Sequence, residues 1–279
     1  MILGKNMMYE TLEKWNKTTF QEAFDGIERT EENEASLKLL AKVLKHQKLT
    51  DKKMNGLCTE GLKKTEAERL GVKYVDFFNE LESSSDFWTP TDLLHNLCKH
   101  NLNNREKYEK KAKKMGISFD KLTWLMCGRA LRALPSYMRE HQLKNELENT
   151  FPNASFCQNA ELDTYYHCDV KMTMNDEDYF VWSFLTSPRS IVNFASKFKG
   201  QRYGTISTGK HVLCPYDREK ESEANFAGWM FYSKEYMDEL KKAVLDTVPV
   251  VYDDVVKASV YDLEFYLNPI VIEKFDIAS

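Results

Sequence analysis

The residues best suited to bind phosphate lie in the second half of the chain. Residues 179–216 contain no Asp or Glu, but they carry five fixed positive charges: Arg189, Lys197, Lys199, Arg202 and Lys210. Aromatic side chains are interleaved with these cations at Phe194, Phe198 and Tyr203. Cations attract a phosphate backbone and aromatic rings stack on unpaired bases, so this basic window (residues 179–216) predicts a surface for DNA or RNA. The alternative is a basic surface that pairs with acidic side chains of the N-terminal half.

A second basic run occupies residues 99–114, where seven Lys and Arg side chains stand against Glu106 and Glu109. Two interpretations of this run remain open. It is the solvated face of a helix, as charge runs usually are, or it contacts a phosphate backbone.

Other kinds of site have little support in the sequence. The six cysteines show no C-x-x-C spacing, which disfavours a metal knuckle and favours buried thiols in a reducing, cytoplasmic compartment. Phosphate-binding glycine loops and the common hydrolase and zinc-protease motifs are absent from the sequence. A thiol enzyme built on Cys168 or Cys214 would need a histidine that the sequence does not place near either residue.

The composition is that of a globular protein. The 279 residues are 42% hydrophobic and 29% charged, with a net charge of −4, which excludes low-hydrophobicity disorder and a uniformly basic nucleic-acid coat. Apolar stretches are too short to span a membrane, and the N-terminus does not resemble a signal peptide. We therefore expect no membrane partner.

The first half of the chain is expected to be helical. Apolar residues recur at helical spacing in residues 34–47 and 65–81, and Thr89-Pro90 has the pattern of an N-cap followed by the first helical residue. These features predict a helical region over residues 1–118, with an internal boundary near residues 83–91.

From residue 119 the pattern changes to a mixture of helices and strands. We expect a long helix over 120–149, which Pro135 kinks or divides, and strands over 154–157, 164–174 and 179–185, the last two forming a hairpin. A helix over 189–199, a strand over 210–215 and a helix from Ser233 follow. Residues 248–278 suggest edge strands or an interaction surface. The predicted fold class is thus α+β, a helical half followed by a mixed sheet flanked by helices over 119–279.

Residues 122–217 resemble the core of the restriction-endonuclease-like superfamily, the PD-(D/E)xK nucleases. In that family a helix leads to a strand that carries a metal-binding acid. A hairpin then leads to a strand with an acid-x-lysine triplet, and a helix and a further strand follow. Asp169, in the sequence HCDVKM, takes the place of the first acid, whereas Trp182 and Phe184 stand where the acid and the lysine are expected.

The resemblance implies a catalytic site formed by Asp169 and Lys171, because side chains two apart on a strand share a face. It also implies a Mg²⁺ or Mn²⁺ ion that polarises the phosphate and activates water. Asp169 and a second carboxylate would hold this ion. We assign that second carboxylate to Asp163, with Glu161, Glu146 and Glu148 as further candidates. The acidic residues 176–178 are expected to form a solvated turn and are left out of the site.

Three functional hypotheses follow. The first is a nuclease-fold protein that binds DNA or RNA and hydrolyses it with a divalent metal if it is active. The second is an inactive form of this fold that binds nucleic acid or a protein, for example a phage or mobile-element factor that blocks a host defence complex. The third is an oligomeric interaction protein, a homo-oligomer for instance, without a nucleic-acid role.

Overall fold

The computed structural model describes 13 stretches of the chain: residues 5–55, 59–63, 66–67, 70–71, 89–158, 162, 168–187, 189–190, 192–194, 210–217, 229–246, 250–251 and 269–273. The chain divides into two compact units. The helical unit comprises Met1–Tyr137 with Ala227–Trp229, and the sheet unit comprises Met138–Phe226 with Met230–Ser279. The division falls inside one long helix, close after Pro135, whereas the sequence pattern changes at residue 119, where this helix begins.

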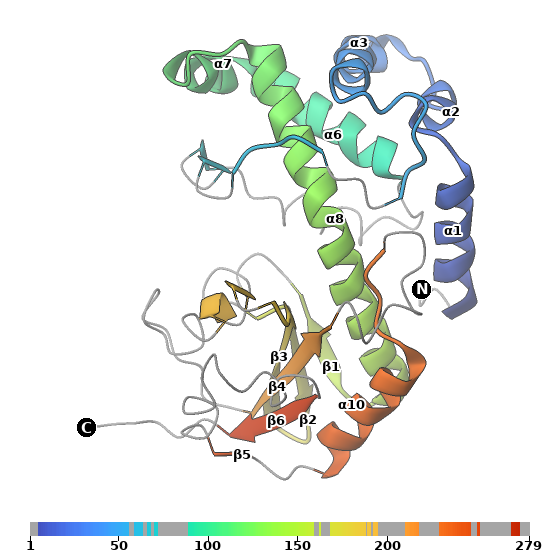
Figure 1. Ribbon diagram of the computed structural model, residues 1–279, viewed down its shortest axis with the longest axis vertical. Coiled ribbons are helices and arrows are strands. Elements are labelled where there is room, and N and C mark those ends of the chain that lie inside the picture. The colour runs from blue at the N-terminus through green and yellow to red at the C-terminus, as the bar shows by residue number, and fades with distance from the viewer. Residues whose placement is uncertain are drawn as a thin grey trace. The chain divides into compact units, whose positions relative to one another are not determined.

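The helical unit confirms the helical character expected of the first half of the chain (Figure 1). Its described helices are α1 (Lys5–Lys17), α2 (Phe20–Asp25), α3 (Glu31–His46), α6 (Pro90–Asn103), α7 (Arg105–Lys114) and the first part of α8 (Phe119–Thr150). Helix α3 begins three residues before the predicted start, because Thr30 caps it and three acids occupy its first turn. Of the helix expected over 65–81, only residues 66, 67 and 70 are described, and they are helical.

The start of α6 is a capping box. The Thr89 side chain accepts a hydrogen bond from Asp92 N, the Asp92 carboxylate accepts one from Thr89 N, and Pro90 occupies the first helical position. The prediction for this boundary is therefore confirmed. Leu93, Leu94 and Leu97, which follow the cap at helical spacing, are fully buried.

An extended segment, residues 59–63, packs against helix α8 at two glycines. A Cβ atom at Gly128 would lie 1.8 Å from Glu60 O, and one at Gly61 would lie 2.3 Å from Arg129 N. The two backbones therefore approach closely only because both positions lack a side chain. The Thr59 hydroxyl donates to Gly128 O at 2.9 Å, and Leu62 N donates to Leu125 O at 3.0 Å.

The sheet unit contains one mixed sheet with the strand order β1-β2-β3-β4-β6-β5 among its described residues. The strands are β1 (Ser155–Cys157), β2 (Val170–Met174), β3 (Glu177–Leu185), β4 (Lys210–Tyr216), β5 (Val250–Val251) and β6 (Ile270–Glu273). β1, β2 and β3 are antiparallel neighbours, β3 is parallel to β4, and β4 is antiparallel to β6. The mixed sheet, its hairpin and the antiparallel pairing next to Asp169 are as predicted. The C-terminal strands are partly different, because β6 pairs with both β4 and β5 and so is not an edge strand.

The hairpin turn is shorter than predicted. Asn175 and Asp176 both have positive φ, 53° and 63°, as a two-residue type I′ turn requires. Glu177 and Asp178 therefore belong to β3 and not to a solvated turn.

Helices α8 and α10 (Lys234–Asp246) pack on one face of the sheet (Figure 1). The core between them is formed by Leu143, Leu147, Phe151, Val170, Met172, Tyr179, Val181, Val212, Cys214, Tyr216, Tyr232, Tyr236, Met237, Leu240 and Val244. The opposite face of the sheet carries Phe180, Trp182 and Phe184, and Phe194 of the following helical segment stacks on Phe184 with ring centroids 4.2 Å apart. Among the described helices, none is both long enough and apolar enough to cross a membrane.

Candidate functional site

The ends of three strands meet at one edge of the sheet. Because β3 and β4 are parallel, their carboxyl ends lie together, with Leu185 opposite Tyr216. Thr186 N donates to Tyr216 O at 3.2 Å and continues this pairing beyond β3. Asp169 precedes β2 at the same edge, where its N–H donates to Val181 O at 3.0 Å. Residues 186–209 of the basic window leave the sheet at this edge, after β3, and lead to the start of β4 at the opposite edge.

Asp169, the acid that the family resemblance singles out, is half-buried at this edge. Its carboxylate accepts a hydrogen bond from Ser183 N at 2.5 Å. This bond ties the start of β2 to the end of β3. The position expected of a metal-binding acid is thus occupied by a carboxylate that supports the backbone of the neighbouring strand.

A buried arginine of α8 contacts the same serine as this carboxylate. Arg139 is only 2% exposed, its Nε donates to Ser183 Oγ at 2.9 Å, and its guanidinium lies 5.1 Å from the centre of the Tyr216 ring. Ser183 therefore joins the two charges, through its backbone to Asp169 and through its hydroxyl to Arg139. The Nη1 atom of Arg139 is buried without a hydrogen-bond partner.

Tyr232 completes this polar cluster. Its hydroxyl lies 2.9 Å from Ser183 Oγ and donates to Cys214 O at 2.7 Å. Gln142 of α8 makes two hydrogen bonds of 2.9 Å with the backbone N–H and carbonyl of Tyr232. These contacts hold the chain before α10 against α8. We call Arg139, Gln142, Asp169, Ser183 and Tyr232 the Asp169 centre.

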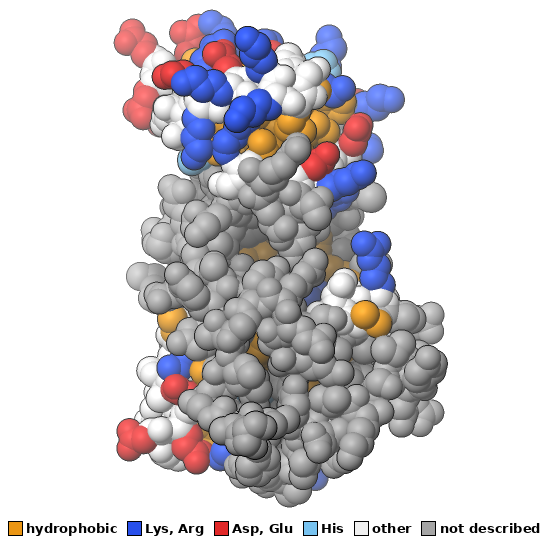
Figure 2. All heavy atoms as spheres, turned by 90° about the vertical axis from the view of Figure 1, so that its left-hand side faces the viewer, with side chains coloured by type: hydrophobic (Ala, Val, Ile, Leu, Met, Phe, Trp, Pro, Cys, Tyr) orange, Lys and Arg blue, Asp and Glu red, His pale blue; other side chains and the backbone are white. Residues whose placement is uncertain are grey.

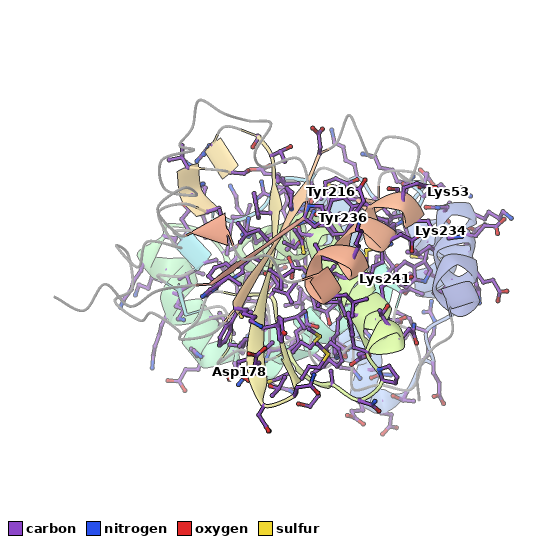
Figure 3. All side chains as sticks on the ribbon, turned by 90° about the horizontal axis from the view of Figure 1, so that it is seen from below. Lys53, Asp178, Tyr216, Lys234, Tyr236 and Lys241 are labelled. Carbon is purple, nitrogen blue, oxygen red and sulfur yellow. The ribbon has the colours of Figure 1, made fainter. Side chains whose placement is uncertain are left out.

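Aromatic rings close the side of the Asp169 centre toward α10. The Tyr232 ring stacks on Tyr236 with centroids 4.5 Å apart and meets Tyr216 edge-on at 5.4 Å. Tyr216 and Tyr236 lie together where β4 passes α10, whereas Asp178 lies far from them along the sheet (Figure 3). The centre is therefore walled by aromatic side chains on this side.

Burial keeps the Tyr232 hydroxyl and the neighbouring Cys214 thiol protonated. Burial raises the pKa of the Cys214 thiol well above its ordinary value, and Asp169 adds to this rise while Arg139 opposes it. Burial also raises the pKa of Tyr232, where Arg139 and the hydrogen bond to Ser183 oppose the rise. A nucleophilic cysteine needs a lowered pKa and access to solvent, so Cys214 does not have the properties of a catalytic thiol.

The described part of the Asp169 centre does not fit a Mg²⁺ or Mn²⁺ ion. Such ions are held by carboxylate, carbonyl and water oxygens, but the contact described for this carboxylate is a backbone N–H, and the Ser183 hydroxyl is engaged by Arg139 and Tyr232. The candidate Glu146 pairs with Lys241 at 4.0 Å, and Glu148 pairs with Lys144 at 3.9 Å. Within the described stretches no three His, Cys, Asp or Glu side chains are grouped to hold a metal. Asp163 and Glu161 lie outside those stretches.

Lys171 does not join Asp169. Its ammonium group pairs with Asp178 at 2.7 Å and lies 5.9 Å from the centre of the Phe180 ring. The expected shared face requires regular strand alternation, but Asp169 lies in a bend before β2 begins. Trp182 and Phe184 stand at the positions of the missing triplet, and their side chains lie on the opposite face of the sheet. There the Trp182 indole donates a hydrogen bond to His211 Nδ1 at 3.0 Å.

The acids at the start of β3 neutralise two of the candidate cations. Lys210 pairs with Glu177 at 2.6 Å, and this hydrogen bond raises the pKa of Lys210 and lowers that of Glu177. Asp178 accepts from Lys171 and from Thr173 Oγ1, and these hydrogen bonds lower its pKa although burial acts in the opposite direction. Lys210 is therefore engaged within the sheet.

The other predicted cations are placed only in part. Arg189 follows β3 and is exposed, while Lys197, Lys199 and Arg202 lie outside the described residues. Arg139, Gln142, Ser183 and Tyr232 were not predicted as site residues. One signal was available for Arg139, since a cation four residues before the buried Leu143 lies on the core-facing stripe of the helix.

Comparison with known proteins found no matching family model, no matching curated protein and no matching solved structure.

Proposed function

We propose that this protein binds DNA or RNA at the sheet edge that carries Asp169, through the part of the basic window that follows β3. The observation that carries this proposal is the parallel pairing of β3 with β4. Residues 186–209 connect these strands, so four of the five cations of the basic window belong to a segment that begins at the Asp169 edge and is attached to the sheet at both ends. Ligand sites of open α/β sheets commonly lie beyond the carboxyl ends of their strands.

The order of elements supports a relationship to the restriction-endonuclease-like superfamily. Helix α8 is followed by β1, by the β2–β3 hairpin, by a helical segment at 192–194 and by β4, with Asp169 at the start of β2. This is the order that the sequence resemblance implies. The proposed fold is therefore nuclease-like, with the nucleic acid at the edge where that family holds its first acid.

Binding without metal-dependent hydrolysis accounts best for the Asp169 centre. Ser183 already links Asp169, through its backbone N–H, to the buried guanidinium of Arg139, through its hydroxyl. A carboxylate that accepts a backbone hydrogen bond from the neighbouring strand is suited to rigid positioning of strands. The Asp169 centre then orders the edge from which the basic window emerges.

A binding titration tests the proposal. Fluorescence anisotropy with labelled single-stranded DNA, duplex DNA and RNA is measured in EDTA at several salt concentrations. Lys197→Gln with Lys199→Gln removes two charges from the basic window. The matched control removes two exposed lysines from α10, Lys234→Gln with Lys242→Gln.

The expected result is salt-sensitive binding by the wild type. The window variant should lower the slope of log K against log salt by about 1–2, because each neutralised phosphate contributes about 0.9 for duplex DNA. The α10 variant should leave the slope unchanged. Equal effects of the two variants, or a wild type that binds none of the three probes, would overturn the proposal.

A further inference from the structure

Helix α7, in the helical unit, separates its charges onto two flanks. On one flank Arg105 pairs with Glu109 at 2.7 Å, and Lys110 pairs with Glu106 at 2.5 Å. These i, i+4 pairs neutralise both acids of the helix. The net positive charge of α7 therefore comes from its remaining lysines.

The other flank carries three lysines without acids. Lys107, Lys111 and Lys114 follow one another at i, i+4 and i+7, a spacing that puts side chains on one side of a helix. We call them the α7 lysine triad. The Lys107 and Lys111 ammonium groups lie 5.6 Å and 5.5 Å from the centre of the Tyr108 ring. This buried ring holds the stems of both lysines against the helix.

The three charges act on one another. Burial lowers the pKa of Lys111, and the nearby charges of Lys107 and Lys114 lower it further. Throughout the described stretches, no carboxylate forms an ion pair with any of the three. Like charges at this spacing are unfavourable, so an external anion would relieve their repulsion.

Over the helical unit, the face in Figure 2 shows many Lys and Arg side chains with Asp and Glu side chains beside them. Lys107 and Lys114 are seven positions apart, or about 10 Å along the helix axis at 1.5 Å per residue. One strand of duplex DNA presents about three phosphates over the same length, at about 3.4 Å each. The spacing and number of the charges therefore fit a regular polyanion.

We infer that the α7 lysine triad is a second contact for the phosphate backbone of nucleic acid, carried by the helical unit. This inference rests on the proposed function, because it assigns the triad the same class of ligand as the basic window. It goes beyond it by giving the helical unit a binding role. Lysine ammonium groups bind phosphate as point charges, so the triad adds affinity and little sequence preference.

The test compares two triple variants of the full chain. The first replaces Lys107, Lys111 and Lys114 with Gln. The control replaces three exposed lysines of the same unit, Lys14, Lys38 and Lys45, with Gln, so that net charge changes equally. Binding to duplex DNA is measured by anisotropy over a range of salt concentrations, and circular dichroism checks that each variant retains its helices.

The triad variant should weaken binding at least about tenfold near 0.1 M salt and lower the salt slope by about 2–3, since three phosphate contacts are lost. The control should change neither value. If the triad variant binds like wild type while the basic-window variant is weakened, the inference is wrong and the proposed function stands. A wild type that binds no nucleic acid overturns both. An effect of the triad on anionic phospholipid vesicles alone would assign it to a membrane surface and would also overturn the inference.

Discussion

At the scale of single residues, Arg139 is the side chain on which the Asp169 centre depends. Arg139→Met keeps much of the side-chain volume but removes the hydrogen bond to Ser183, the contact with Tyr216 and the guanidinium charge. Hydrogen bonds from a charged donor contribute more than neutral ones, so we expect a loss of unfolding free energy on the order of 2 kcal/mol.

Urea unfolding followed by circular dichroism measures this loss. Lys121→Met is the matched control, because Lys121 is an exposed cation on the same helix, and it should change stability by less than about 0.5 kcal/mol. Equal stabilities of the two variants would show that the Arg139 network contributes nothing to the fold.

The residues of the site show where sequence reasoning reaches its limit. The basic window and Asp169 could be found because charge composition and one motif position are visible along the chain. Ser183 and Tyr232 could not, because their roles depend on hydrogen bonds that join residues 49 positions apart in sequence. Lys171 pairs with Asp178 and does not join Asp169, because a bend at Asp169 breaks the alternation on which the expected shared face depended.

At the scale of elements, the β2–β3 hairpin should respond to acid. The pKa of Asp178 is lowered in the folded protein by its hydrogen bonds with Lys171 and Thr173, which outweigh the opposing effect of burial. The folded state therefore binds fewer protons there than the unfolded state. The stabilisation by Asp178 is complete above its ordinary pKa of 3.8 and is lost as pH falls through the lowered value.

Urea midpoints measured from about pH 2 to pH 6 test this dependence. Asp178→Asn should reduce the midpoint at pH 6 and flatten its fall toward acid. Asp176→Asn removes the same charge from the adjacent turn, where Asn also tolerates the positive φ, and should leave the profile close to that of wild type. Identical profiles for the two variants would contradict this role of Asp178.

Elements were predicted better than contacts, for reasons that particular residues make clear. The α6 start followed from Thr89 and Pro90, since capping is a local property. The central strands followed from short apolar runs between turn residues. The position of β6 between β4 and β5 did not, because strand order is set by tertiary pairing that no local pattern records.

At the scale of the whole molecule, we expect nucleic-acid binding that does not depend on a divalent metal. Binding should persist in EDTA, and Mg²⁺ or Mn²⁺ should not raise the affinity, because phosphate is bound by Lys and Arg and divalent cations compete with them for it. Plasmid DNA, single-stranded DNA and RNA should remain intact with either metal.

Asp169→Asn provides the comparison for this assay. Cleavage by wild type that disappears in this variant would show that Asp169 is a metal ligand and that residues outside the described stretches complete the site. Cleavage that is equal in both proteins would point to another source and would leave the assignment of the Asp169 centre unchanged.

The most direct test of the central claim is photo-crosslinking to DNA and RNA that contain 4-thio-substituted bases, followed by peptide mapping. We expect crosslinked peptides from residues 186–209, which join the carboxyl end of β3 to β4 and contain Phe194, Phe198 and Tyr203. Excess unlabelled nucleic acid and high salt should both suppress these crosslinks. Crosslinks that fall only elsewhere in the chain, or that persist at high salt, would contradict binding through this edge.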